Sequence, residues 1–287
     1  MPGVRDSRRL WVLFEPIHAL TYFAPEAHHA YEEVGLRGFW RGYFASRAAP
    51  LGPVGPGVAT ACFYGFHPAF VARALPDIWS IAAPPAALAA RLSGVDGAIR
   101  RLYPDEIDRP AFRESTNLLR EALETCAGAG RPLFSANRGL EWPEAPHLAL
   151  WHAATLAREH RGDGHVATLT ALGIGPCEAH VLRLAADGTP RESLQPHRGW
   201  SNDHWTAALD VLARRGWVDA DERLTEEGRA VRQLVESTTD RLADELFAHI
   251  DDARYEQLVA HLHAIARRLV ETGTIPYPNP IGVPPPS

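Results

Sequence analysis

The sequence resembles itself at a nearly constant offset, and this internal repeat constrains the fold more than any other feature of the chain. The segment that begins at Gly55 aligns with the one that begins at Gly175, since both open with Gly-Pro and close on Trp-Ser. Further matches keep the same order: Pro16–Leu20 with Pro146–Leu150, His29–Ala30 with His152–Ala153, Arg37–Gly38 with Arg161–Gly162, and Pro85–Leu92 with Thr206–Ala213. The preserved order predicts a tandem duplication; the alternative is two unrelated helical halves in an alanine-rich chain.

The second copy has the pattern of a winged helix. Apolar residues at helical spacing occupy Ala179–Ala186, and Ser201 can cap a further helix whose apolar face includes Trp205 and Leu212. The run WVDADERLT at Trp217–Thr225 predicts strand, tight turn and strand before another helix. We therefore expect a mainly α fold of tandem duplicated winged-helix-like repeats about a pseudo-twofold axis, with small β-hairpin wings and a C-terminal helix.

The repeat also sets the expected division of the chain. The copies are joined near Gly139–Pro146, Leu242–Leu269 has leucines at helical spacing, and the proline-rich end is expected to be extended or disordered. The expected parts are residues 10–140 for the first repeat, 141–245 for the second, 246–275 for the C-terminal helix and 276–287 for the tail. A terminal helix of this kind packs on the body or pairs two copies, so a homodimer through it is one expectation.

Several stretches are similar to a known family. EPIHALTYFAPEA, GLRGFWRGYFASRAAPLGPVGP, FYGFHPAFVARALPDIW, PHLALWHAATLAREHRGDGHVATL, LQPHRGWS and LTEEGRA lie within residues 10–245, and with them the chain resembles the SalK-type actinobacterial helix-turn-helix proteins. The phrase LARRGWVDADERLTEEGRAV is also similar to the hairpin of MarR-type winged-helix proteins. The resemblance implies a winged-helix relationship, but it does not imply a particular reaction.

Composition excludes several classes of function. All 29 basic residues are arginine, which excludes Schiff-base and P-loop lysine chemistry. The formal net charge of −6 disfavours non-specific binding to nucleic acid, because neutralising phosphates needs a basic face. No apolar run approaches the roughly 20 residues that cross a bilayer. Three scattered cysteines fit a reducing compartment, so a cytoplasmic protein without a membrane partner is expected.

Sequence-specific DNA reading is also disfavoured. A winged helix places its third helix in the major groove and its wing near phosphates. The candidate recognition helix carries Asp203 and Asp210, and the expected wing is acidic. Arg198, Arg214 and Arg215 are the candidates for a few contacts to the DNA backbone. The residues at the expected interface therefore disagree with the function that the fold suggests.

Candidate catalytic residues cluster around an expected helix break. The helix from Pro146 is predicted to end near His160, to break at Arg161–Gly164 and to resume at His165. Acidic, basic and imidazole groups at such a point can transfer protons or bind an anion. The candidates are Arg158, His160, Arg161, Asp163 and His165. In the structural alternative, Asp163 only caps the helix at His165.

Aromatic and histidine residues occur at corresponding points of the two copies. They would line an aromatic-walled pocket between the halves, in which the segments around His18 and His147 face each other. The candidate ligand-binding residues are His18, Tyr22, Trp40, Tyr43, Tyr64, His67, His147, Trp151 and His152. A lone histidine on an apolar helix is, however, more often a hydrogen-bonded core residue.

Cofactor signals are weak. The chain has no H-E-x-x-H or C-x-x-C spacing and no Gly-rich nucleotide fingerprint. A haem or a metal ion held by His18, His67 or His152 stays open. We therefore expect a small-molecule-binding protein, and favour an enzyme of specialised metabolism on a scaffold that no longer reads DNA. The alternatives are a MarR-like ligand-responsive transcription regulator and a non-catalytic protein that binds a ligand, haem or metal.

Overall fold

The computed structural model describes residues 6–104, 110–277, 279, 282–283 and 285–286, and most of them are helical. The helices of the first part are α1 (Ser7–Phe23), α2 (Pro25–Glu33), α3 (Phe39–Ala48), η1 (Ala49–Leu51), α4 (Pro56–Phe63), α5 (Pro68–Val71), α6 (Ile78–Ile81), α7 (Pro84–Leu102), α8 (Pro110–Glu124) and α9 (Pro132–Arg138). Those of the second part are α10 (Pro146–Ala171), α11 (Pro176–Asp187), η2 (Arg191–Ser193), α12 (Gln195–Arg198), α13 (Asn202–Arg214), α14 (Glu226–Asp244), η3 (Glu245–Phe247) and α15 (Asp252–Glu271). The predicted mainly α class is confirmed.

Proline explains where many of these helices start. Its fixed φ suits the first helical position, where the missing N–H has no partner to lose. Helices α2, α4, α5, α7, α8, α9, α10 and α11 all begin at a proline. Other starts use side-chain caps, as expected for Ser201, which accepts a hydrogen bond from the N–H of His204 at the start of α13. The abundance of proline is thus compatible with a helical fold.

Helix α10 runs without interruption from Pro146 to Ala171, so the predicted break at Arg161–Gly164 is wrong. One glycine of that segment, Gly164, allows close packing instead. A Cβ at Gly164 would lie 2.9 Å from Arg131 Nη1 and 3.5 Å from the Cβ of Leu242. Glycine lets these neighbours approach the helix, and tertiary contact outweighs the weak local preference against helix.

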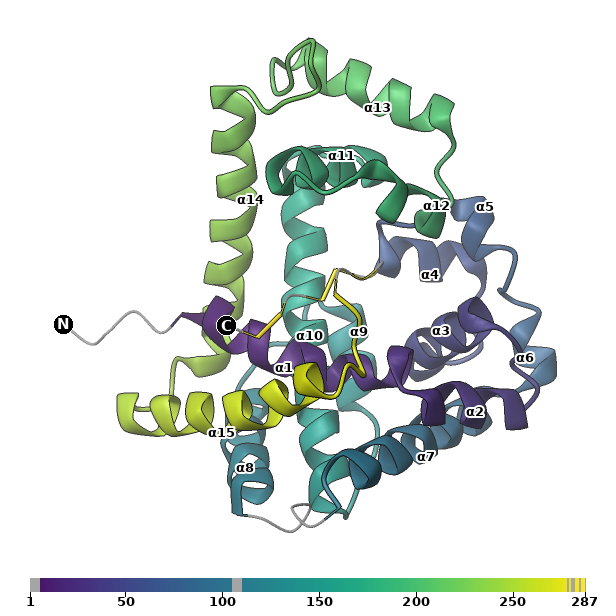
Figure 1. The fold of residues 1–287 in the computed structure, drawn as a ribbon, viewed down its shortest axis with the longest axis vertical. Helices are drawn as coiled ribbons and strands as arrows, with labels where there is room; N and C mark the ends of the chain where they lie inside the picture. Colours follow the sequence, from purple (N-terminus) through teal and green to yellow (C-terminus); the bar gives the residue numbers. More distant parts are fainter. Residues whose placement is uncertain (1–5, 105–109, 278, 280–281, 284, 287) are drawn as a thin grey trace.

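Two hydrophobic cores share α10 (Figure 1). The larger core surrounds its first half, where α1, α7, α8 and α9 pack on α10. The smaller core lies between its end, α11, α13 and α14, and includes Leu169, Val181 and Trp205. Helix α14 then runs back along α10, as the view in Figure 1 shows. The chain thus forms a large helical body and a smaller unit joined through one long helix.

The smaller unit follows the predicted helix order but has almost no β structure. The hairpin predicted at Trp217–Thr225 is reduced to one antiparallel bridge between Val218 and Leu224, and no longer strand occurs in the described ranges. The N–H of Asp219 donates to the Arg223 carbonyl at 2.9 Å, which closes the turn. The segment predicted to be a wing is therefore a tight turn held at its base.

The chain end returns to the body. Leu242–Leu269, predicted as one helical stretch, is divided into the end of α14, η3 and α15. Helix α15 buries Leu258, Leu262 and Leu269 against the body, where it contacts α1 and α8. In the tail, Val283 is buried in the larger core. Of the helices in the described ranges, none combines the length and apolar character that a bilayer crossing requires.

Candidate functional site

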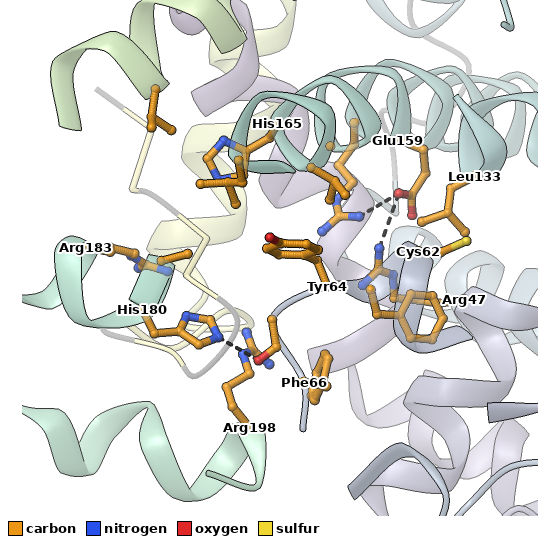
Figure 2. Close-up of a pocket in the computed structure, with 18 of the residues that line it drawn as sticks. Arg47, Cys62, Tyr64, Phe66, Leu133, Glu159, His165, His180, Arg183 and Arg198 are labelled. Carbon is orange, nitrogen blue, oxygen red and sulfur yellow. Dashed lines mark hydrogen bonds and ion pairs between the residues drawn. The ribbon is translucent and has the colours of Figure 1, made fainter. Parts of the chain in front are cut away.

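A cavity of about 220 Å³ lies where the two hydrophobic cores meet. Its walls come from α3, the chain around the end of α4, α9, α10, α11, α12 and α14 (Figure 2). Its aromatic lining residues are Tyr43, Phe63, Tyr64 and Phe66, and its ionisable ones include Arg47, Arg158, Glu159, His165, His180, Arg183, Arg198 and Arg232. Aromatic walls with a few convergent polar groups are typical of small-molecule sites.

Four charges from α1, α3 and α10 form a continuous chain of ion pairs beside this cavity. A Glu159 carboxylate oxygen lies 2.7 Å from Arg158 Nη1 and 3.3 Å from Arg47 Nη2. Arg158 Nε lies 3.3 Å from a carboxylate oxygen of Glu15. Burial favours a higher pKa for Glu159, but the two arginines outweigh it and hold that pKa below its usual value. Two positive and two negative charges thus balance in this wall.

Two histidines of the cavity have their tautomers fixed by hydrogen bonds. His180 Nε2 lies 2.7 Å from the Gly65 carbonyl oxygen, which can only accept, so Nε2 carries the proton. His165 Nδ1 lies 3.0 Å from the Thr239 hydroxyl, which itself donates to the Val235 carbonyl, so His165 donates from Nδ1. Burial lowers the pKa of His180 to about 3 and that of His165 to about 4. Both rings are therefore neutral at pH 7, each with a lone pair on the other nitrogen.

Tyr64 lies among these groups in a strained backbone conformation (Figure 2). Its φ of 46° and ψ of −63° fall outside the regions that a side chain ordinarily allows. The Tyr64 hydroxyl donates to the Ile174 carbonyl, which ties α4 to the smaller unit. A Cβ at the next residue, Gly65, would lie 2.7 Å from His180 Nε2. Strain of this kind costs about 1–3 kcal/mol and clusters at functional sites.

Of the residues that the sequence singles out, Tyr43, Tyr64, Arg158 and His165 line the cavity. The continuous helix explains the division of the predicted catalytic group. Residues 158, 162, 165, 166 and 169 of α10 share one face, because residues three and four apart are neighbours on a helix surface. The other three candidates, His160, Arg161 and Asp163, do not line the cavity.

Those three residues contact other helices. The His160 ring packs edge-on against Phe134 at 5.1 Å, with both ring nitrogens buried and without a hydrogen-bond partner. Arg161 Nη2 lies 2.8 Å from an Asp240 carboxylate oxygen on α14. The Asp163 carboxylate accepts the backbone N–H of Phe134 at 2.9 Å. Asp163 therefore caps a helix, but the helix is α9 rather than the one expected at His165.

His18, Tyr22 and Trp151 form a hydrogen-bonded group between α1 and α10. His18 Nδ1 lies 2.9 Å from the Thr155 hydroxyl, and its Nε2 lies 2.9 Å from that of Tyr22. The Trp151 indole donates to the His18 carbonyl at 3.2 Å. Helices α1 and α10 do pack together, but His147 bonds to Asp96 on α7 at 2.6 Å instead of facing His18.

The remaining candidates have separate surroundings. Trp40 belongs to an aromatic cluster with Phe39, Tyr43, Phe44, Phe66 and Phe70. His67 caps α5, and its ring lies 4.6 Å from that of His204. The His152 ring packs against Trp142 at 4.9 Å, and burial lowers its pKa to about 3. Within the described part of the chain, no group of three or more histidine, cysteine or acidic residues is placed to hold a metal ion.

Sequence reasoning did not select several residues of the cavity. Phe66, His180, Arg183 and Arg232 lay outside the predicted site, and Arg198 was considered only as a DNA contact. They come from four separate elements that only the fold brings together. The segment LQPHRGWS held the one sequence signal for Arg198, because a glycine, Gly199, follows it. Gly199 has a φ of +76°, and a Cβ added there would lie 2.4 Å from the Cβ of Phe70. That close approach brings α12 against α5.

Comparison with known proteins gives one match. A family model described as a helix-turn-helix family matches residues 7–276. No curated protein and no solved structure matches this chain.

Proposed function

This chain belongs to a helix-turn-helix family, and we propose that its smaller unit forms one side of a small-molecule site and that the chain is an enzyme of specialised metabolism. The observation that supports this proposal best is the cavity itself, which is lined by elements of both cores. A partly enclosed space whose lining includes five arginines, two neutral histidines and several aromatic rings is typical of a site that binds a polar small molecule.

The chemistry that the lining supports is proton transfer. His165 presents its unprotonated Nε2, and the pKa of about 4 keeps it unprotonated at neutral pH. Tyr64, held in its strained conformation, lies in the same cavity. A neutral imidazole with a free ring nitrogen can accept a proton from a bound ligand. We propose His165 as the proton acceptor, with Arg198 supplying positive charge.

We propose the tandem winged-helix assignment from the order of the helices along the chain. Helices α1, α4, α5 and α7 of the first half correspond in order to α10, α11, α12 and α13 of the second. This order supports a tandem duplication about a pseudo-twofold axis and a SalK-type, MarR-like winged-helix origin of each half. The bridge between Val218 and Leu224 would then be a reduced wing.

A ligand-responsive transcription regulator is the second candidate, favoured by the family match. The surface of the smaller unit weighs against it. Asp203 and Asp210 are exposed on α13, and Asp219 and Asp221 are exposed on the turn. Of the three arginines considered for phosphate contacts, Arg198 is buried. Arg215 donates to the carbonyls of Leu172 and Gly173, and Arg214 remains exposed.

The test is capture of small molecules by the full chain. Wild type and an Ala179→Phe variant, which fills the cavity, are incubated with a metabolite extract of the native host and separated from free metabolites. The released compounds are identified by mass spectrometry. Ala207→Phe, at an exposed position of α13 that does not line the cavity, is the control. We expect a compound retained by wild type and control but lost from Ala179→Phe; equal retention by all three would overturn the proposal.

The same samples separate the candidate functions. Conversion of the retained compound over time supports the enzyme, and its recovery unchanged supports a non-catalytic binding protein. A gel-shift experiment at low salt with DNA upstream of the gene tests the regulator. A specific shift that the retained compound abolishes would replace the enzyme with the regulator.

A further inference from the structure

Most arginines around the cavity have a carboxylate partner. Arg47 and Arg158 share Glu159 and Glu15, as described above. Arg232 is paired with Glu236. Arg183 Nε lies 3.4 Å from a carboxylate oxygen of Asp187. Within the described residues, Arg198 is the cavity arginine for which no carboxylate lies within ion-pair distance.

Arg198 is also deeply buried. Only 7% of its surface is exposed, and its Nη1 has no hydrogen-bond partner. The guanidinium carbon lies 4.4 Å from the centre of the Phe66 ring, which supports the cation but cannot neutralise it. Burial lowers the pKa of Arg198 to about 10, which still leaves the side chain charged at pH 7. The cavity thus contains a desolvated positive charge without a counter-charge.

The ring of His165 lines the same cavity, and one of its nitrogens has no hydrogen-bond partner among the described residues. His165 donates its Nδ1–H to the Thr239 hydroxyl, and that hydroxyl donates to the Val235 carbonyl. If the ring proton moved to Nε2, the hydrogen bond between His165 and Thr239 would be lost. Nε2 is left as an acceptor, and no described residue donates to it. A ligand that satisfied both groups would need an anion at one point and a donor at another.

We propose that the cavity takes an organic acid that also carries a hydroxyl or amine group, with the acid bound by Arg198 and the donor bound by His165 Nε2. This inference rests on the proposed function and assigns the ligand class. A monoanion suffices, because the other charges of the wall already have partners. The aromatic residues Phe63, Tyr64 and Phe66 also line the cavity, and they suit a ligand with a planar body.

Binding is tested by thermal shift and ligand-observed NMR with three probes of one shape. They are 4-(hydroxymethyl)benzoate, 4-methylbenzoate, which lacks the donor, and 4-(hydroxymethyl)benzamide, which lacks the charge. We expect the hydroxymethyl acid to bind about tenfold more tightly than each of the others. In His165→Leu the advantage over the methyl acid disappears, and the advantage over the amide remains.

Arg198→Met supplies a readout that needs no ligand. An unpaired buried charge is destabilising, so this variant should melt at a higher temperature than wild type and bind the acid no better than the amide. The control is Arg91→Met, a buried arginine over Trp151 whose Nη1 donates to the Ser46 carbonyl at 3.0 Å. That variant should melt at a lower temperature, because it leaves buried acceptors without a donor.

Three results would overturn the inference. A lower melting temperature for Arg198→Met, comparable to that of Arg91→Met, would make Arg198 a structural residue. Equal affinity for acid and amide would show that charge is not recognised. Failure of every probe to bind wild type at millimolar concentration would reject this pairing of acid and donor. The capture experiment above still reports whether the cavity holds a small molecule, so the two proposals fail separately.

Discussion

The Asp163 carboxylate on α10 accepts the backbone N–H of Phe134 on α9 at 2.9 Å, and so one helix caps the start of another. Phe134 lies in the first turn of α9, where a backbone N–H has no partner within its own helix. Asp163 is 4% exposed, and among the described residues no cation lies within ion-pair distance of its carboxylate. Burial raises the pKa of Asp163 to about 6, although the Phe134 N–H and nearby arginines oppose that rise.

This relationship predicts how substitutions at Asp163 behave. Asp163→Asn keeps an acceptor for the Phe134 N–H and should be nearly neutral at pH 7, whereas Asp163→Ala should lower the free energy of unfolding by about 1 kcal/mol. Neither change should alter ligand affinity, since Asp163 does not line the cavity. Urea unfolding and probe binding of the two variants provide the measurement. Loss of binding in Asp163→Asn would restore a chemical role for the carboxylate.

The raised pKa also predicts a pH dependence. Between the ordinary value of 3.8 and about 6, the unfolded chain has lost the Asp163 proton while the folded chain still holds it. The contribution of this group to stability is therefore complete below pH 3.8 and is lost as pH rises through 6. Asp163→Asn should thus gain stability relative to wild type between pH 4.5 and pH 7.5. If the stability of Asp163→Asn relative to wild type instead fell as pH rose, the raised pKa of Asp163 would be contradicted.

The buried histidines predict the opposite pH dependence, a loss of stability as the pH falls. Burial lowers the pKa of His160 to about 3, so its stability contribution is present above pH 6.5 and is lost as pH falls toward 3. His160→Leu removes that proton uptake and also two unsatisfied ring nitrogens. The variant should therefore unfold at a lower pH than wild type when the acid transition is followed by circular dichroism. His263→Leu, at an exposed site of α15, should leave the transition where it is.

Coupling across the buried ion pairs can be measured with a double-mutant cycle. In Glu159→Gln, Arg47 loses its carboxylate partner, whereas Arg158 keeps Glu15. Breaking a buried pair costs about 3–5 kcal/mol, so each single variant should be strongly destabilised. The double variant Arg47→Met with Glu159→Gln should lose at least about 1 kcal/mol less than the sum. The exposed pair Arg9 and Glu256 is the control and should show no measurable coupling.

The sequence predicted features that depend on local chemistry. Ser201 caps α13, and the buried Trp205 and Leu212 lie on the expected face, because both signals act within one helix. The glycines of Arg161–Gly164 misled the prediction, because the same residue type that ends a helix also allows close approach of a neighbour. Only the fold shows that Arg131 and Leu242 occupy that space.

Part of the candidate site was predictable from residue type alone, and the rest depends on contacts between distant segments. Tyr64 and His165 stood out as unusual residue types in their segments, and the structure places both in the cavity. Arg198 and His180 could not be selected, since arginine and histidine are common in this chain and their burial depends on α11 and α12 meeting the chain at Gly65 and Phe66. The unpaired charge at Arg198 is a property of its neighbours rather than of its own sequence position.

The turn at Val218–Leu224 packs tightly on the first turn of α14. A Cβ at Gly228 would lie 1.9 Å from the Trp217 carbonyl oxygen, an acceptor already bonded to the Thr225 N–H. Gly228→Ala must therefore displace the turn and should lower the free energy of unfolding by about 1–3 kcal/mol. Gly57→Ala is the control, because Gly57 also lies in the first turn of a helix and a Cβ there meets nothing within 4 Å. Chemical denaturation and hydrogen exchange at Asp219 and Thr225 report the two effects. Equal stability of the two variants would show that the turn does not rest on α14, and the proposed reduced wing would be abandoned.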